Sequence, residues 1–316
     1  MLSVRFWGVR GSIPSPGADT VYYGGNTTCL EIRADERLLI VDLGTGIRPL
    51  GDWLIANDLK EKGCIEADIF VSHTHWDHIM GFPLFIPIFI PETTLRIRGP
   101  VSFEEDSLKT IIENQLSYRY WPVRAGELAA KIEYSQLRET ILESTHCAAS
   151  GVCGSPLDLG GGLKVSSKFL NHPIFCLGYR FDYKGKSIVT IFDHEPFQNL
   201  FPTDPSAAGY NKEAAREGEL AAIEENERVC RFFKDADLLI HDAQYTKEEY
   251  LTHRGWGHGS YEHAIDSAVK ANVKKLVFFH HDPARTDEQL KKLENDYAGK
   301  ISAETMMARE GLTITL

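Results

Sequence analysis

The sequence predicts an α/β fold, and two observations support this. Short runs rich in β-branched and aromatic residues alternate with longer, charged stretches of helical period, an order typical of α/β proteins. Hydrophobic residues make up 43% of the 316 residues, which is enough for a sizeable core. The chain has no low-complexity tract and no short repeat, so we expect a single domain over residues 1–316.

The first half begins with a β-rich stretch. We expect strands at residues 2–8, 28–33 and 37–42, then one ending at Ser72 and one at 95–98. Helical patterns run from 47 to 59 and from 104 to 115. Residues 117–161 fit no single element. They contain short strand candidates, and we expect an insertion or a loop over the site there.

The second half repeats this style. Strands are expected at 163–169, 177–183, 186–192, 238–240, 275–279 and 312–316. Helices are expected at 212–233, 261–271 and 287–297. Two β-rich halves, each followed by helices, make up the predicted molecule.

The charge and the hydrophobic pattern of the chain argue against nucleic acid and membranes as binding partners. The formal net charge of −11 argues against a broad basic surface for nucleic acid. No apolar run is long enough to span a bilayer, and residues 1–6 enter a strand pattern at once, so we expect a cytoplasmic protein without a membrane partner. The six cysteines lack metal-binding spacing and are expected to be free thiols. A local bridge or an extra metal contact is the alternative for Cys147 and Cys153.

The segment after the apolar run 69–71 holds four potential metal ligands, His73, His75, Asp77 and His78. Imidazoles and a carboxylate suit zinc or iron-type ions. Adjacent side chains point in different directions, so ligands this close are more easily shared between two ions than fitted around one. A solvated, His-rich loop would explain one or two of the histidines but not the whole set.

This segment, His73-Thr74-His75-Trp76-Asp77-His78, resembles the His-x-His-x-Asp-His signature of the metallo-β-lactamase superfamily. The resemblance implies a four-layer αβ/βα sandwich with two divalent metal ions, zinc first, with manganese and iron as alternatives. It also allows a homodimer, since family members often dimerise.

The resemblance implies three further ligands at strand ends. His172 precedes a Gly-Tyr-Arg strand, Asp193 follows the strand 187–191, and His280 ends the strand 276–279, with His281 as its rival. The implied sets are His73, His75 and His172 on one ion and Asp77, His78 and His280 on the other, with Asp193 and a hydroxide shared.

Two more segments resemble the phosphodiesterase and transfer-RNA 3′-processing branches. His258 lies in Gly-Trp-Gly-His-Gly-Ser, and Asp242 lies in His-Asp-Ala-Gln, which is similar to the His-Glu-Ala-Thr segment of those branches. The resemblance implies that His258 contacts phosphate or protonates the leaving group and that Asp242 orients it. Asp77 is the third expected catalytic residue. A surface role is the alternative for Asp242.

Other residues are expected to support the site or to contact substrate. By resemblance, Asp42 orients a ligand histidine and Asn26 lies in a loop on the floor of the site. Tyr179, Arg180 and Trp256 are candidates for base stacking or phosphate contact, with core packing as the alternative.

The expected function is a dinuclear metal-dependent phosphodiesterase that hydrolyses a cyclic nucleotide or a similar small phosphodiester by attack of a metal-bridging hydroxide. One alternative is a tRNA 3′-processing endoribonuclease, against which the acidic balance and the lack of a basic arm argue. A diiron redox protein and a non-catalytic sensor are the others. The redox branch usually has a carboxylate in place of His75, and a sensor would lack ligands that this chain has.

Overall fold

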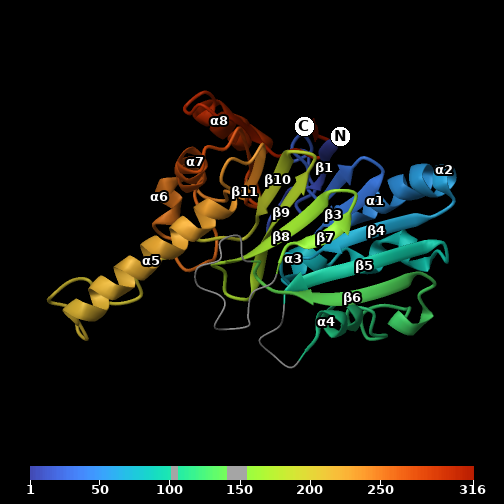
Figure 1. The fold of residues 1–316 in the computed structure, drawn as a ribbon, viewed down its shortest axis with the longest axis horizontal. Helices are drawn as coiled ribbons and strands as arrows, with labels where there is room; N and C mark the ends of the chain where they lie inside the picture. The colour runs from blue at the N-terminus through green and yellow to red at the C-terminus, as the bar shows by residue number, and fades with distance from the viewer. Residues whose placement is uncertain (101–105, 141–154) are drawn as a thin grey trace.

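Two seven-stranded sheets form the centre of the molecule (Figure 1). The structure is a computed structural model that describes residues 1–100, 106–140 and 155–316. The first sheet has the order β14 (Thr313–Thr315), β1 (Leu2–Gly8), β2 (Cys29–Ala34), β3 (Arg37–Val41), β4 (Ile65–Phe70), β5 (Thr93–Pro100) and β6 (Lys131–Leu137). The second has the order β13 (Glu304–Met307), β12 (Lys275–Phe279), β11 (Leu238–Asp242), β10 (Lys186–Ile191), β9 (Cys176–Tyr183), β8 (Leu163–Leu170) and β7 (Leu157–Gly160).

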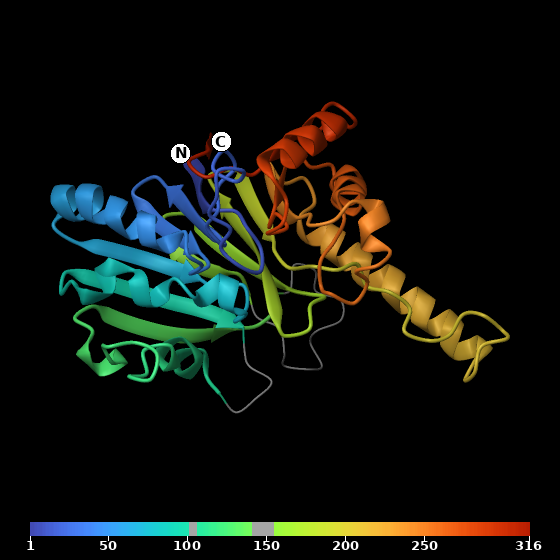
Figure 2. The same cartoon turned by 180° about the vertical axis from the view of Figure 1, so that it is seen from behind.

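Helices cover the outer faces of both sheets (Figures 1 and 2). The first sheet carries α1 (Ile47–Leu54), a π-helical turn η1 (Ile55–Leu59), α2 (Lys60–Lys62), α3 (Trp76–Ile79), the 3₁₀ turns η2 (Phe82–Leu84) and η3 (Ile86–Phe89), α4 (Leu108–Asn114) and η4 (Ala125–Glu127). The second carries α5 (Lys212–Phe232), α6 (Lys247–Tyr250), α7 (Tyr261–Lys270) and α8 (Asp287–Tyr297). One end of α5 projects from the body of the molecule (Figure 1).

Three apolar clusters separate four layers. Strand β3 shows how, because Leu39 and Val41 face the cluster between the sheets while Leu38 and Ile40 face the one under α1. On β11, Ile240 faces the inter-sheet cluster, and Leu239 packs in the third cluster, beneath the helices of the second sheet. Strands buried on both faces read as continuous apolar runs, as these do. The four-layer sandwich expected from the sequence is therefore confirmed.

The topology brings distant segments to one edge. Strands β3, β4 and β5 are parallel, and so are β10, β11 and β12. In parallel sheets the carboxyl ends of the strands lie on the same side, where α/β proteins bind ligands. The segments after β3, β4, β10, β11 and β12 contain most of the residues singled out in the sequence.

Some expected elements differ from the structure. The helix expected at 47–59 changes to a π-helical turn at Ile55. The helix expected from 104 begins at Leu108, because the side chain of Ser107 accepts a hydrogen bond from Thr110 N and caps it. The short strand β13, which lacks an alternating pattern, was missed. Residues 117–161 are not simply a loop, since their described part adds the edge strands β6 and β7 to the two sheets.

In the described ranges, Cys29, Cys64, Cys176 and Cys230 are free thiols. The Cys147–Cys153 alternative lies outside the described residues. Among the helices of the described ranges, none combines the length and the apolar character that crossing a bilayer requires.

Candidate metal centre and catalytic site

The loop after β4 carries the ligand-rich segment. His73 and His78 are fully buried, and Asp77 and His78 lie on the single turn of α3. The backbone N of Ser12, from the glycine-containing loop after β1, donates a 2.7 Å hydrogen bond to Asp77 Oδ2. This contact was not expected from the sequence, which offers only the turn residues of that loop as a signal.

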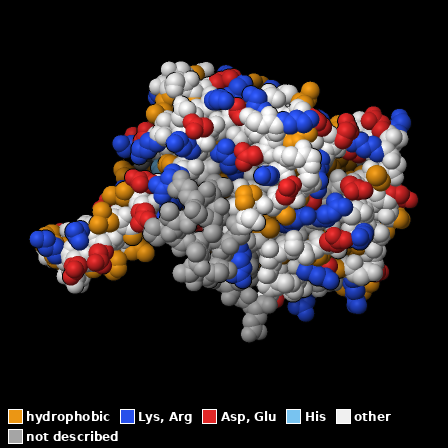
Figure 3. All heavy atoms as spheres, viewed as in Figure 1, with side chains coloured by type: hydrophobic (Ala, Val, Ile, Leu, Met, Phe, Trp, Pro, Cys, Tyr) orange, Lys and Arg blue, Asp and Glu red, His pale blue; other side chains and the backbone are white. Residues whose placement is uncertain are grey.

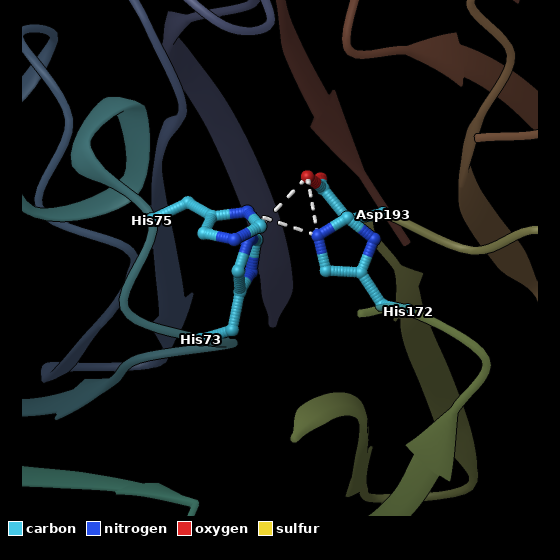
Figure 4. Close-up of side chains that lie close together, drawn as sticks. All are labelled: His73, His75, His172 and Asp193. Atoms are coloured by element: carbon cyan, nitrogen blue, oxygen red, sulfur yellow. Dashed lines mark hydrogen bonds and ion pairs between the residues drawn. The ribbon is translucent and has the colours of Figure 1, made fainter. Parts of the chain in front are cut away.

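His73, His75, His172 and Asp193 converge in a first group, whose ligand atoms lie within 4.8 Å of one another (Figure 4). His172 Nε2 is 3.0 Å from His75 Nδ1. His73 Nε2 is 3.4 Å from Asp193 Oδ2, although it has no hydrogen-bond partner. These residues come from the ends of β4, β8 and β10.

A second group adjoins the first and consists of Asp77, His78, Asp193 and His280. His280 Nε2 lies 3.1 Å from Asp77 Oδ2 and 3.2 Å from Asp193 Oδ1. His78 Nε2 lies 3.2 Å from each of the same two carboxylate atoms. Asp193 thus directs one oxygen toward each group.

The donor set fits divalent cations. Asp193 Oδ1 and His73 Nε2 are buried without a hydrogen-bond partner, which is costly unless a cation is bound there. Burial lowers the pKa of His73 well below its usual value and that of His172 to about 4, which favours the neutral, ligating form of both. The site therefore has nitrogen and oxygen ligands for two ions, and the set contains no thiolate.

Opposite charges shift the pKa values of Asp193 and His78 away from those that burial alone would produce. Burial raises the pKa of Asp193, but His280, His78 and His73 outweigh it and hold that pKa well below its usual value. Burial lowers the pKa of His78, yet the charges of Asp193, Asp77 and Asp42 raise it well above the usual value. Bound cations would replace this protonated histidine as the counter-charge.

Neighbouring groups fix the tautomers of the candidate ligands. His78 Nδ1 donates to Asp42 Oδ2 at 2.7 Å, and His172 Nδ1 donates to the Gly257 carbonyl at 3.0 Å. Each contact leaves Nε2 free to bind a metal. The geometry of Asp42 agrees with the orienting role that the resemblance implies for it.

Three residues at this edge adopt left-handed backbone conformations that side chains rarely take. Asp42, Asp193 and His280 have φ values of 64°, 44° and 61°. Each follows a strand, β3, β10 or β12, and each directs its side chain at the two groups. Such strain is typical of functional sites.

His258 lies beside the second group. Its Nδ1 donates to Asp242 Oδ2 at 3.0 Å, and its ring stacks on that of His280 at 5.0 Å. Burial lowers the pKa of His258, but the Asp242 carboxylate outweighs this and raises it to about 9. Asp242 is fully buried, so the surface alternative for it is wrong.

The rival ligand His281 points elsewhere. Its Nε2 donates to the Ala308 carbonyl at 2.8 Å, and it is in neither group. Between the two histidines, the backbone conformation at His280 selects the one that faces the site.

Two candidates for substrate contact lie away from the ligand groups, and for Tyr179 the core-packing alternative holds. Tyr179 is fully buried between the sheets, where its hydroxyl donates to the Val71 carbonyl at 2.6 Å and supports the ligand loop. Arg180 is on the opposite face of β9, where it bonds to Asp182 and to carbonyls at the end of α5.

Asn26 and Trp256 are the remaining residues that were expected to support the site or contact substrate. The side chain and backbone N of Asn26 donate to Glu310, so Asn26 holds its loop in place rather than facing the ligand groups. Trp256 is 62% exposed and precedes Gly257, whose carbonyl binds His172.

A four-layer sandwich with buried histidine and aspartate groups at the carboxyl ends of its strands is the arrangement of a metal-dependent hydrolase. The family described as Metallo-beta-lactamase superfamily matches residues 22–158, and the chain therefore carries a domain of this superfamily.

Relatives agree with this assignment. Ribonuclease Z of Streptococcus pneumoniae (strain CGSP14) is 26% identical over 261 residues, covering 73% of this chain and 76% of the relative. Among solved structures, the metallo-beta-lactamase fold protein YhfI from Bacillus subtilis has a TM-score of 0.62 at 18% identity, covering 99% of this chain and 98% of YhfI. A diphosphatase from the PhnP family has a TM-score of 0.60 at 14% identity, covering 100% of this chain and 98% of its own. At these identities the structures show the shared fold alone.

Proposed function

We propose that the chain is a dinuclear metal-dependent phosphodiesterase that acts on a cyclic nucleotide or a similar small phosphodiester. The observation that carries the proposal is the placement of the His258–Asp242 pair directly against the second ligand group. Hydrolysis of a phosphodiester needs both electrostatic stabilisation and a proton for the leaving oxygen, and the two features together provide them.

The proposed division of roles follows from the geometry. His73, His75 and His172 would hold one ion and Asp77, His78 and His280 the other, with Asp193 between them. Two divalent ions, zinc in our proposal, would activate water and stabilise charge on the phosphoryl oxygens.

The proton comes from the protein. Asp242 accepts from Nδ1 of His258, and this leaves the Nε2 proton available for the leaving oxygen. In this proposal the two ligand groups bind the ions, and His258 donates the proton.

Surface properties support a small substrate. On the face in Figure 3, the described Lys and Arg side chains are interspersed with Asp and Glu rather than gathered in one area. Trp76, which lies between His75 and Asp77, is 76% exposed, and Trp256 is also exposed. Exposed aromatic rings beside a phosphate site are suited to stacking on a nucleobase.

A second candidate is tRNA 3′ processing, because the curated relatives include ribonuclease Z. The net charge of −11 opposes it, since tRNA binding depends on neutralising many phosphates.

The test is hydrolysis of 2′,3′- and 3′,5′-cyclic nucleotides, of bis-p-nitrophenyl phosphate and of a precursor tRNA with a 3′ trailer. Metal-reconstituted protein is compared with its His75→Ala variant. We expect metal-dependent turnover of a cyclic nucleotide that the variant lacks. Cleavage of the tRNA alone would favour the second candidate, and inactivity on every substrate would overturn the phosphodiesterase proposal.

A further inference from the structure

Glu195 has a buried carboxylate that neither ligand group contains. It is 5% exposed and accepts five hydrogen bonds. Oε1 accepts from Tyr250 Oη at 2.8 Å, Gln198 Nε2 at 3.0 Å and Gly255 N at 2.8 Å. Oε2 accepts from Gly255 N and Gly257 N, both at 2.9 Å. Neutral donors therefore satisfy a charge that is expensive to bury.

Two of these donors belong to the loop that leads into His258. Gly255 and Gly257 have φ values of 83° and 87°, a conformation that favours glycine. A Cβ on Gly257 would collide with His172 Nδ1, so backbone and ligand lie in close contact. The Gly257 carbonyl accepts from His172, and the next residue is His258. The loop conformation thus determines the placement of both histidines.

The backbone of Glu195 is fixed to the other side of the site. Its N donates to the Asn171 carbonyl at 3.0 Å, and Asn171 Nδ2 donates to the Glu195 carbonyl at 3.0 Å. Asn171 precedes His172, and Glu195 follows Asp193 by two residues. Glu195 therefore links the segments after β8 and β10 to the 255–257 loop.

We propose that Glu195 is a positioning residue that holds the 255–257 loop so that His172 faces the first ligand group and His258 faces the leaving oxygen. This inference rests on the proposed function. A carboxylate is required because both of its oxygens only accept. Gly255 N donates to both oxygens, so the N–H groups of a glutamine would face this donor whichever way its amide is turned.

The main experiment compares Glu195→Gln with the matched control Glu249→Gln. Glu249 also accepts charge-assisted bonds, but from Arg285, and its carboxylate does not contact the 255–257 loop.

The substrates are a diester with a p-nitrophenolate leaving group and a cyclic nucleotide with an alkoxide leaving group. A displaced proton donor matters most for the poorer leaving group, so Glu195→Gln should lower kcat on the cyclic nucleotide roughly 10- to 100-fold and on the p-nitrophenyl diester only slightly. Equal losses on both substrates would contradict the positioning of His258, and no loss beyond that of the control would overturn the inference.

A second measurement does not depend on activity. Hydrogen exchange in a peptide covering residues 251–259 should be faster in Glu195→Gln and Glu195→Ala than in wild type or Glu249→Gln. The amides of Gly255 and Gly257 lose one acceptor oxygen in the first variant and both in the second. Glu195 lines an open groove of about 350 Å³ that also contains Gly255 and Gly257, so formate can reach the space left in Glu195→Ala.

Added formate should slow exchange in Glu195→Ala and restore part of its turnover, while Glu249→Ala should not respond. Unchanged loop exchange in both Glu195 variants would contradict the positioning role. A wild-type protein without phosphodiesterase activity, but with formate-sensitive loop exchange in Glu195→Ala, would overturn the proposed function while supporting the control of the loop by Glu195.

Discussion

At the scale of single residues, the environments of His172 and His258 move the pKa values of two identical side chains in opposite directions. Burial without a dedicated carboxylate partner lowers the pKa of His172 to about 4, whereas Asp242 raises that of His258 to about 9. The neutral histidine is suited to bind metal and the protonated one to donate a proton. For these two histidines, environment rather than residue type separates the roles.

Replacing His258 tests this assignment. His258→Gln should lower kcat on a cyclic nucleotide about 10²- to 10⁴-fold, because the leaving alkoxide loses its proton donor. Metal content, measured by atomic absorption, should stay the same because His258 belongs to neither metal-holding group in our proposal. His253→Gln is the control and should retain most activity, because His253 bonds to the Glu249 carbonyl and belongs to no ligand group among the described residues. Unchanged turnover in His258→Gln would rule out the proton-donor role.

At the scale of elements, the strands of the first sheet are tied to the helical layer that covers them. Arg33 on β2 donates from Nη1 and Nη2 to the two oxygens of Asp58 in the π-helical turn, at 2.9 and 3.0 Å. This bidentate pair connects the first sheet with the outer layer that covers it. Burial raises the pKa of Asp58, but Arg33 outweighs this and lowers it below the usual value.

Asp58→Asn should reduce the free energy of unfolding at pH 7 by roughly 1–3 kcal/mol, the range for a partly buried, charge-assisted bond. Because the pKa of Asp58 is lower in the folded state, its contribution is complete above the unfolded value of about 4 and is lost as the pH falls through the folded value. The difference between metal-free wild type and variant in urea unfolding should therefore be largest above about pH 4 and should shrink as the pH falls below that value. A difference that stays constant with pH would contradict this account.

At the scale of the whole molecule, the metal centre joins the two sheets. Four of the candidate ligands follow β4 of the first sheet, and the others, His172, Asp193 and His280, follow strands of the second. An ion bound there holds both halves of the sandwich, so binding and folding should be coupled.

Removal of metal should accordingly lower the melting temperature. At a free metal concentration 100 times Kd, binding adds about 2.7 kcal/mol, which corresponds to several degrees for a chain of this size. Calorimetry of the metal-reconstituted and chelator-treated protein measures the shift. Asp193→Ala, which removes the shared carboxylate, should show a much smaller metal-dependent shift, and an equal shift in that variant would contradict the shared role.

The fold was largely predictable because its signals are local. Apolar runs such as 38–41 and 238–240 are strands whether or not their partners are known, and the alternation of strands and helices predicts the layers. The strand that was missed, β13, has a weak local signal and depends on its neighbour β12 for its hydrogen bonds. For the same reason, the edge strands β6 and β7 could not be given bounds from the sequence.

By itself, the sequence determined the ligand-rich segment 73–78, because six consecutive positions contain its chemistry. Only the tertiary structure decided that His280 rather than His281 faces the ligand groups and that Tyr179 and Arg180 lie away from them. It also decided that Glu195 bonds to the loop before His258. The physical reason is that a side chain's direction depends on one backbone conformation and its long-range packing. A linear pattern records residue type and spacing, but not the contacts between segments that lie far apart in the chain.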